Sequence, residues 1–210
     1  MKSFLKDRVR LVRELMNSGP NVAYADLCLI LCAALSACAA LRWPGKKIDR
    51  KRFIELLVLH SNPDHNAGWI SVPALISNGL LQESVTPYGK PGEFTRIFCD
   101  YEIDMDIANA RTSYPSVKDS DLRSHSYACL IYEWIRCGYA HEYCLNGHAT
   151  SVPASYRPAK VSYIGSLNGV NISRVACFHI DYLIALTDYH VDHIPLAPDR
   201  IPIKWWIDGG

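Results

Sequence analysis

An arginine and a histidine lie five positions apart near the middle of the chain, at Arg136 and His141, just after an apolar run over residues 128–135. The guanidinium of arginine stays charged and can hold a phosphate, whereas the imidazole of histidine exchanges a proton near neutral pH. These groups are the minimum for cleaving RNA without a metal ion, because the ribose 2′-hydroxyl supplies the nucleophile. The pair is therefore the first candidate for a catalytic site.

A straight α-helix would direct these two side chains to different faces. Five helical steps turn about 500°, so Arg136 and His141 would point about 140° apart. Both reach one phosphate only if the helix is distorted near Gly138 or if two subunits share the site. A symmetric dimer meets the second condition, because its isologous interface presents both residues twice across one axis. Without such an arrangement, the pair is an ordinary solvated helix end, where His141 lies near the C-terminal dipole.

The segment from Tyr132 to Tyr143, with the sequence YEWIRCGYAHEY, resembles the R-x-x-x-x-H-x-Y motif of HEPN ribonucleases. The resemblance implies an α-helical up-down bundle in which two protomers form a ribonuclease cleft, with Arg136 and His141 as the catalytic residues. It also implies that Tyr143 matches a tyrosine that HEPN toxins use for regulatory nucleotidylation, although the residue is equally expected to serve in packing. Cys137 departs from the pattern, since this position is often Asn, His or Asp in active members.

The mechanism that the resemblance implies needs no cofactor and no metal ion. His141 withdraws the 2′-hydroxyl proton or protonates the leaving 5′-oxygen, and Arg136 stabilises the charge of the transition state. Glu133, one turn before Arg136, either orients the guanidinium or forms an ordinary ion pair with it. HEPN proteins commonly act as toxins or in defence against phage, so an antitoxin or regulatory protein is an expected partner. The alternative is a catalytically silent HEPN-like scaffold or partner-binding domain.

Binding of RNA would have to be local, because 22 basic and 21 acidic residues leave a net charge of only +1. The densest basic cluster is the candidate surface for the RNA backbone, although such runs are more commonly solvated helix faces. This cluster comprises Lys46, Lys47, Arg50, Lys51 and Arg52. A second cluster lies in residues 2–13. The Trp205–Trp206 pair is expected to pack or to form a dimer contact rather than to stack on bases.

The spacing C-x-x-x-H-x-x-C-x-x-x-H suggests zinc as a third interpretation, with Cys137, His141, Cys144 and His148 as its ligands. On one helix these positions span about 16 Å, while zinc bonds are about 2 Å long, so at most two neighbours share an ion. We therefore expect no metal. The eight cysteines form no C-x-x-C pair, which favours a reduced, cytoplasmic protein. The uncharged run over residues 27–41 is shorter than the roughly 20 residues of a membrane span, so we expect a buried helix.

Hydrophobic periodicity, capping residues and turn residues predict the elements that position these side chains. Helices are expected over residues 3–17, 21–42, 50–60, 72–81, 121–145 and 177–194, and a short strand over residues 94–99. Asn21 and Asp49 are the expected caps of the second and third helices. The Asn168-Gly169 pair predicts a β-hairpin over residues 160–174. We expect a single, mainly helical domain over residues 1–210, with the hairpin inserted before the last helix and residues 61–119 as an irregular insertion.

Overall fold

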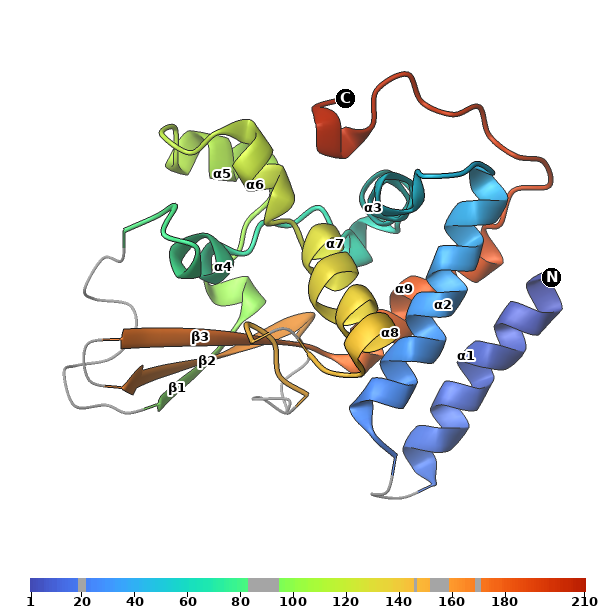
Figure 1. Cartoon of the computed structure of the whole chain (residues 1–210), viewed down its shortest axis with the longest axis horizontal. Helices are drawn as coiled ribbons and strands as arrows, with labels where there is room; N and C mark the ends of the chain where they lie inside the picture. The colour runs from blue at the N-terminus through green and yellow to red at the C-terminus, as the bar shows by residue number, and fades with distance from the viewer. Residues whose placement is uncertain (19–21, 83–94, 146, 152–158, 169–170) are drawn as a thin grey trace.

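The chain forms a mainly helical structure with a three-stranded antiparallel sheet, as Figure 1 shows. The computed structural model describes residues 1–18, 22–82, 95–145, 147–151, 159–168 and 171–210, with the backbone alone for residues 95–98, 165–168 and 171–174. The helices are α1 (Lys2–Asn17), α2 (Tyr24–Arg42), α3 (Asp49–Leu59), α4 (Val72–Ser77), α5 (Ile107–Ser113), α6 (Asp119–Ser124), α7 (Tyr127–Leu130), α8 (Gly138–Glu142) and α9 (Ile180–Asp192). The strands are β1 (Thr95–Cys99), β2 (Val161–Asn168) and β3 (Asn171–Phe178). The prediction of a mainly helical chain with a small sheet is confirmed.

Helix α2 is the central helix because its sequence is apolar on nearly every side. No charged residue occurs between Asp26 and Arg42, and α2 contacts α1, α3, α8 and α9. Within the described ranges, α2 is the one helix that is long and apolar enough to cross a membrane. Here it packs against protein instead, as expected for a buried core helix. The predicted cap Asn21 lies outside the described residues, and Ala23 occupies the N-cap position.

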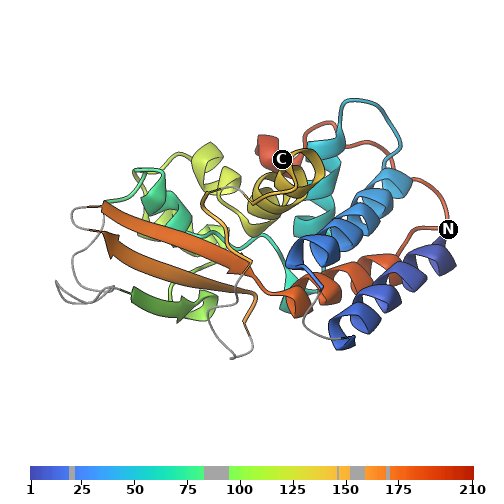
Figure 2. The ribbon, with the colours of Figure 1, turned by 60° about the horizontal axis from the view of Figure 1, so that its bottom comes forward.

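Helix α1 is amphipathic and covers one side of the α2–α9 pair (Figure 2). Leu5, Val9 and Val12 are buried, which is the i, i+4, i+7 spacing of a single apolar stripe. Its basic residues are largely used in ion pairs with α9. Lys6 Nζ lies 2.6 Å from Asp192, and Arg13 pairs with Asp188. The N-terminal basic cluster therefore binds the adjacent helix rather than presenting a continuous positive surface.

Strands β2 and β3 form the predicted hairpin, and β3 runs beyond the predicted end at residue 174 to Phe178. The register pairs Asn168 with Asn171 and Val161 with Phe178. The expected strand over residues 94–99 is present as β1 and pairs with β2, so the sheet order is β1-β2-β3. The predicted start of the last helix at Cys177 is wrong, because Cys177 pairs with Ser162 in the sheet and α9 begins at Ile180.

Residues 61–119 are not irregular throughout, since α4, β1 and α5 lie within them. A buried carboxylate, Asp104, joins this segment to the rest of the molecule. Its Oδ2 accepts hydrogen bonds from the hydroxyls of Tyr127 and Tyr163, both at 2.5 Å, and its Oδ1 accepts one from the backbone N–H of Val72 at 3.0 Å. One side chain thus holds α4, α7 and β2 together.

The C-terminal segment returns to the helices through its two tryptophans. Trp205 and Trp206 are both buried, and the ring of Trp205 meets Trp43 edge-on at 5.7 Å. The backbone N–H of Trp206 donates to the Glu55 carboxylate at 2.6 Å, and Arg123 donates to the Trp206 carbonyl at 2.5 Å. Among the interpretations of this pair, packing within the chain agrees with the structure.

Candidate active site

The motif residues lie on a continuous helix, residues 127–142, whose middle part is a π-helix at Ile131–Cys137. The predicted helix over residues 121–145 is wrong in extent. Its start is interrupted because the backbone at residues 125–127 pairs with a neighbouring segment: Ser71 N donates to His125 O at 3.0 Å and Tyr127 N to Trp69 O at 2.9 Å. Ser126 then caps the new helix, accepting from Cys129 N at 3.4 Å.

The π-helical turns supply a distortion directly before Gly138. The π-helix ends at Cys137 and the remaining four steps to His141 run through α8, so the distortion lies mainly before Arg136 rather than between Arg136 and His141. Single π-helical turns occur mostly inside α-helices and are frequent at functional sites. The inward face of the segment is fixed by packing, since Ile131, Trp134 and Ile135 are buried. Arg136 lies near the end of the segment and is half-buried.

Arg136 is half-buried and has no carboxylate partner. Its guanidinium carbon lies 5.2 Å from the centre of the Tyr132 ring, and Nη1 lies 3.8 Å from the sulfur of Cys137. Among the arginines whose side chains the structure describes, Arg136 shares this lack of an ion pair with Arg8 and Arg200. A guanidinium held on an aromatic ring without an acid remains available to an anion.

Glu133 does not orient Arg136, contrary to one of the roles expected for it. Its Oε1 accepts from Nη2 of Arg50 at 2.7 Å and from Nε at 3.2 Å. Arg50 lies on α3, so this ion pair ties α3 to the π-helical segment. The physical reason for the difference is a long-range contact: α3 brings a guanidinium to Glu133 that the local i, i+3 spacing does not reveal. The consequence is that Arg136 stays unpaired.

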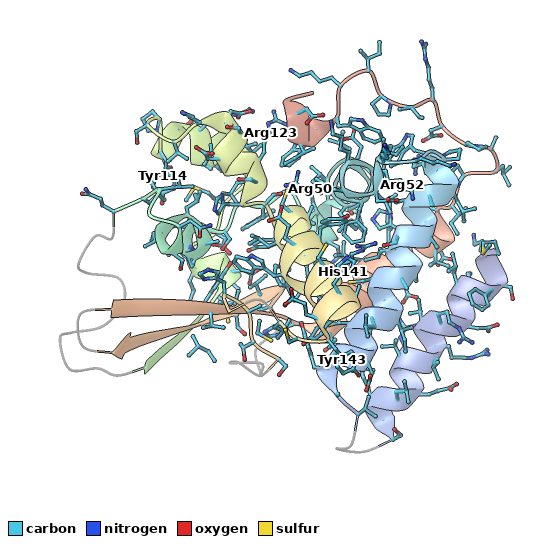
Figure 3. The ribbon with its side chains drawn as sticks, viewed as in Figure 1. Arg50, Arg52, Tyr114, Arg123, His141 and Tyr143 are labelled. Carbon is cyan, nitrogen blue, oxygen red and sulfur yellow. The ribbon has the colours of Figure 1, made fainter. Side chains whose placement is uncertain are left out.

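His141 is exposed on α8, beside the N-terminal half of α2 (Figure 3). In the part of the chain that the structure describes, its imidazole has no hydrogen-bond or ion-pair partner. Both ring nitrogens are therefore accessible to a bound molecule. A histidine in this setting can act as a general acid or base as soon as a substrate is positioned beside it.

Tyr143 ends the helix in the left-handed conformation, with φ of 51°. Its ring is 59% exposed and lies edge-on to Tyr139, with 6.5 Å between ring centres. Its hydroxyl donates to the carboxylate of Asp26 on the first turn of α2. This hydrogen bond raises the pKa of Tyr143 above its usual value. The residue thus has a structural role in tying the end of α8 to α2.

The predicted RNA-binding cluster is dispersed by the fold. Arg50 pairs with Glu133, Lys51 Nζ lies 2.7 Å from Asp208, and Arg52 pairs with Asp49. Figure 3 shows Arg50 and Arg52 on opposite sides of α3. Asp49 is the first residue of α3 rather than its cap, which is Ile48.

Lys46 and Lys47 are the two members of that cluster that stay exposed without an ion pair among the described residues. They precede α3, and Lys47 has a positive φ of 63°. Within the predicted cluster, this short loop therefore keeps free positive charge for an RNA backbone.

The four residues of the zinc interpretation do not share a helix, because the helix ends at Glu142. The sulfur of Cys144 lies 3.6 Å from Glu142 Oε2, and the ring of His148 faces Trp134 at 5.7 Å. Across the residues described, no group of three or more His, Cys, Asp or Glu side chains is close enough to hold a metal ion. All eight cysteines are free thiols.

A cavity of about 810 Å³ is a second candidate site, which the sequence did not indicate. Asp100, Lys160 and His179 line it. Asp100 follows β1 and Lys160 precedes β2, and the β1–β2 register, which pairs Cys99 with Ser162, brings these distant positions together. The only signal in the sequence was the placement of charged residues directly beside expected strands. Their partnership depends on the register, which the sequence alone did not provide.

Comparisons of the chain with protein-family models, with curated proteins and with solved structures gave no match. The function is therefore inferred from the residues of the site and their geometry.

Proposed function

We propose that this protein is a metal-independent endoribonuclease of HEPN type, a cytoplasmic homodimer that acts as a toxin or in defence against phage. The observation that carries the proposal is that, among the described residues, neither Arg136 nor His141 has a carboxylate partner on this one distorted helix. Seven other arginines in the described part of the chain are neutralised by acids. Arg136 is not, although Glu133 lies only three residues away.

A second copy of the chain would complete the site. Arg136 lies at the end of the π-helical segment, and the remaining steps to His141 run through α8, so the distortion only partly changes their relative direction. Pairing two α8 faces about a symmetry axis places Arg136 of one protomer near His141 of the other. The exposed position of α8 leaves its outer face open to such a contact.

The chemistry follows from the two groups. A neutral His141 accepts the proton of the ribose 2′-hydroxyl as that oxygen attacks the adjacent phosphorus, and the 5′-oxygen leaves with a proton from a second imidazole or from water. Arg136 offers parallel N–H donors to the non-bridging oxygens, where negative charge develops. The products are a 2′,3′-cyclic phosphate and a 5′-hydroxyl. No residue in this scheme requires a metal ion.

The test is cleavage of a mixed RNA pool in the presence of EDTA. We expect the wild-type protein to generate 2′,3′-cyclic phosphate ends and to leave a 2′-O-methylated RNA of the same sequence intact. Arg136→Gln and His141→Gln should each lose at least about a hundredfold in rate. His193→Gln and Arg200→Gln are matched controls, since both residues are exposed and lie on other elements. Cleavage that survives in His141→Gln would refute the proposed role.

A mixture of the two inactive variants tests the shared site. If Arg136 and His141 act from different protomers, a heterodimer of Arg136→Gln and His141→Gln retains one intact Arg–His combination and regains activity. If they act within one protomer, the mixture stays inactive. A stable monomer with no cleavage by any protein would favour the scaffold alternative.

A further inference from the structure

The cavity near the start of α9 is lined by aromatic and charged side chains. It lies where β3 leads into α9, beside the C-terminal end of α1, in the region that Figure 2 brings forward. Its volume of about 810 Å³ is within the usual size range for small-molecule sites. Aromatic side chains, among them Tyr24, Tyr101 and Tyr182, form much of the wall. The proposed ribonuclease chemistry uses none of these residues.

The charge of the lining is negative. Three carboxylates line the cavity, those of Asp64, Asp100 and Asp181, against one lysine, Lys160, and two histidines, His65 and His179. His179 adds no positive charge near neutral pH, because burial lowers its pKa below the usual value and its Nε2 lies 2.9 Å from the hydroxyl of Ser162. A cavity with this balance attracts cations and disfavours phosphates and carboxylates.

Asp100 is the specific feature of the site. It is only 5% exposed, and its Oδ1 has no hydrogen-bond partner in the structure as described. Burial raises the pKa of Asp100, while the backbone groups of Tyr101 and Lys160 oppose that change. A buried acceptor without a donor is costly, so such atoms in proteins usually await a water, an ion or a ligand.

Lys160 does not satisfy this carboxylate. Its ammonium lies 4.8 Å from the centre of the Trp69 ring, and no ion pair within 4.0 Å joins it to an acid among the described residues. A metal ion is also a poor occupant, because the three carboxylates do not gather into a ligand group. The occupant has to bring a hydrogen-bond donor with its positive charge, and an apolar body for the aromatic walls.

We propose that this cavity binds a small organic ammonium compound with an aromatic body, whose ammonium group pairs with the carboxylate of Asp100 while its ring lies among the tyrosines. Asp64 and Asp181 supply the surrounding negative field. The proposal does not rest on the ribonuclease activity, since neither Arg136 nor His141 lines the cavity.

Tryptamine is a suitable probe, with indole-3-ethanol and indole-3-acetate as its neutral and anionic counterparts. We expect calorimetric titration to rank the affinities in the order amine, alcohol, acid. The amine should bind at least about tenfold more tightly than the alcohol, as a charged hydrogen bond to a buried carboxylate provides. Equal affinities for the three compounds, tighter binding of the acid, or no binding of tryptamine would each overturn the proposal.

Two variants with opposite expected effects sharpen the test. Asp100→Asn should weaken tryptamine binding about tenfold while leaving the alcohol nearly unchanged. Lys160→Gln should strengthen tryptamine binding, because it removes the one competing positive charge; a loss of binding would instead identify Lys160 as the ligand's anchor and refute the amine. Asp7→Asn is the matched control, since it removes one acid from α1 far from Met16, the α1 residue that lines the cavity. Circular dichroism confirms that each variant is folded.

Discussion

The motif helix over residues 127–142 and the Asp104 junction place polar groups in opposite ways. Arg136 and His141 are at least partly open to solvent and have no carboxylate partner among the described residues. Asp104 is buried, and both of its oxygens are used by groups from three separate elements. Free groups cost the fold little and are available for chemistry, whereas satisfied buried groups hold the fold and are unavailable. Substitutions should therefore affect activity at the first place and stability at the second.

The largest effect on stability is expected for Asp104→Ala. The change leaves the hydroxyls of Tyr127 and Tyr163 and the N–H of Val72 without their acceptor inside the protein. Each such loss costs roughly 1 kcal/mol or more, so we expect the free energy of unfolding to fall by about 3 kcal/mol or more. Urea unfolding at pH 5.5 measures it. His141→Ala, at an exposed position, should change the same quantity by no more than about 0.5 kcal/mol. If the two substitutions lowered the free energy of unfolding equally, the distinction between a stabilising junction and a functional site would be wrong.

The next largest effect is the change in the free energy of unfolding with pH that Asp104 causes. Burial raises the pKa of Asp104 to about 7, while its hydrogen bonds from Tyr127 and Tyr163 act to lower it. A carboxyl group that binds its proton more tightly in the folded state stabilises the fold at low pH, and this stability is lost as pH rises from about 4 through 7. Between pH 5.5 and 8, the wild type should lose about 2 kcal/mol relative to Asp104→Asn.

His190 opposes Asp104 in this pH range, so the comparison with Asp104→Asn is needed. Burial lowers the pKa of His190 to about 3, and its Nε2 lies 2.9 Å from the hydroxyl of Ser61. A histidine whose folded pKa is depressed stabilises the fold above pH 6.5, and this stability is lost as pH falls. Because His190 is present in both proteins, its contribution cancels in the difference. Parallel stability curves for the two proteins would contradict the assignment to Asp104.

The Arg50–Glu133 ion pair is expected to affect activity more than stability. Arg50→Gln releases Glu133, which can then reach Arg136 at the i, i+3 spacing and compete with the phosphate. We expect RNA cleavage to fall severalfold. The loss of stability should be no more than about 1 kcal/mol, because the pair is more than 40% exposed on both sides. The double variant Arg50→Gln/Glu133→Gln should recover most of the activity. A double variant that stays as slow as the single one would show that Arg50 acts by another route.

The sequence predicted what depends on local patterns, and the rest needed tertiary contacts. The apolar stripe of Leu5, Val9 and Val12 predicted α1, and the Asn168-Gly169 pair predicted the hairpin. The same reasoning extended one helix across His125, because it could not detect the backbone pairing with Ser71 that interrupts it. The predicted end of that helix near residue 145 was also too late.

For the candidate site, too, the sequence revealed what lies close together in the chain and missed what depends on tertiary contacts. Arg136 and His141 were recognisable because they are close in the sequence and share one helix. Glu133 and Arg50 were assigned separately, one to the catalytic group and one to the RNA surface, although they bind each other across 83 positions. The π-helical turns and the cavity beside Asp100 arise from packing and strand register, which a single sequence does not encode in any short window.

The smallest effect on stability is expected at Tyr143, which combines a hydrogen-bonded polar group with an exposed side chain. Its hydroxyl is committed to Asp26, like the groups at the junction, but its ring is exposed, like His141. Because solvent replaces a lost hydrogen bond at an exposed site, Tyr143→Phe should leave the thermal unfolding midpoint within about one degree of the wild type. The bond should still be visible in the pKa of Tyr143, which Asp26 raises. Removing that acceptor with Asp26→Asn should lower the pKa toward its usual value in an NMR titration of the tyrosine ring. An unchanged pKa would mean that the hydroxyl points to solvent, and α8 would then meet α2 through the ring contact between Tyr24 and Tyr139.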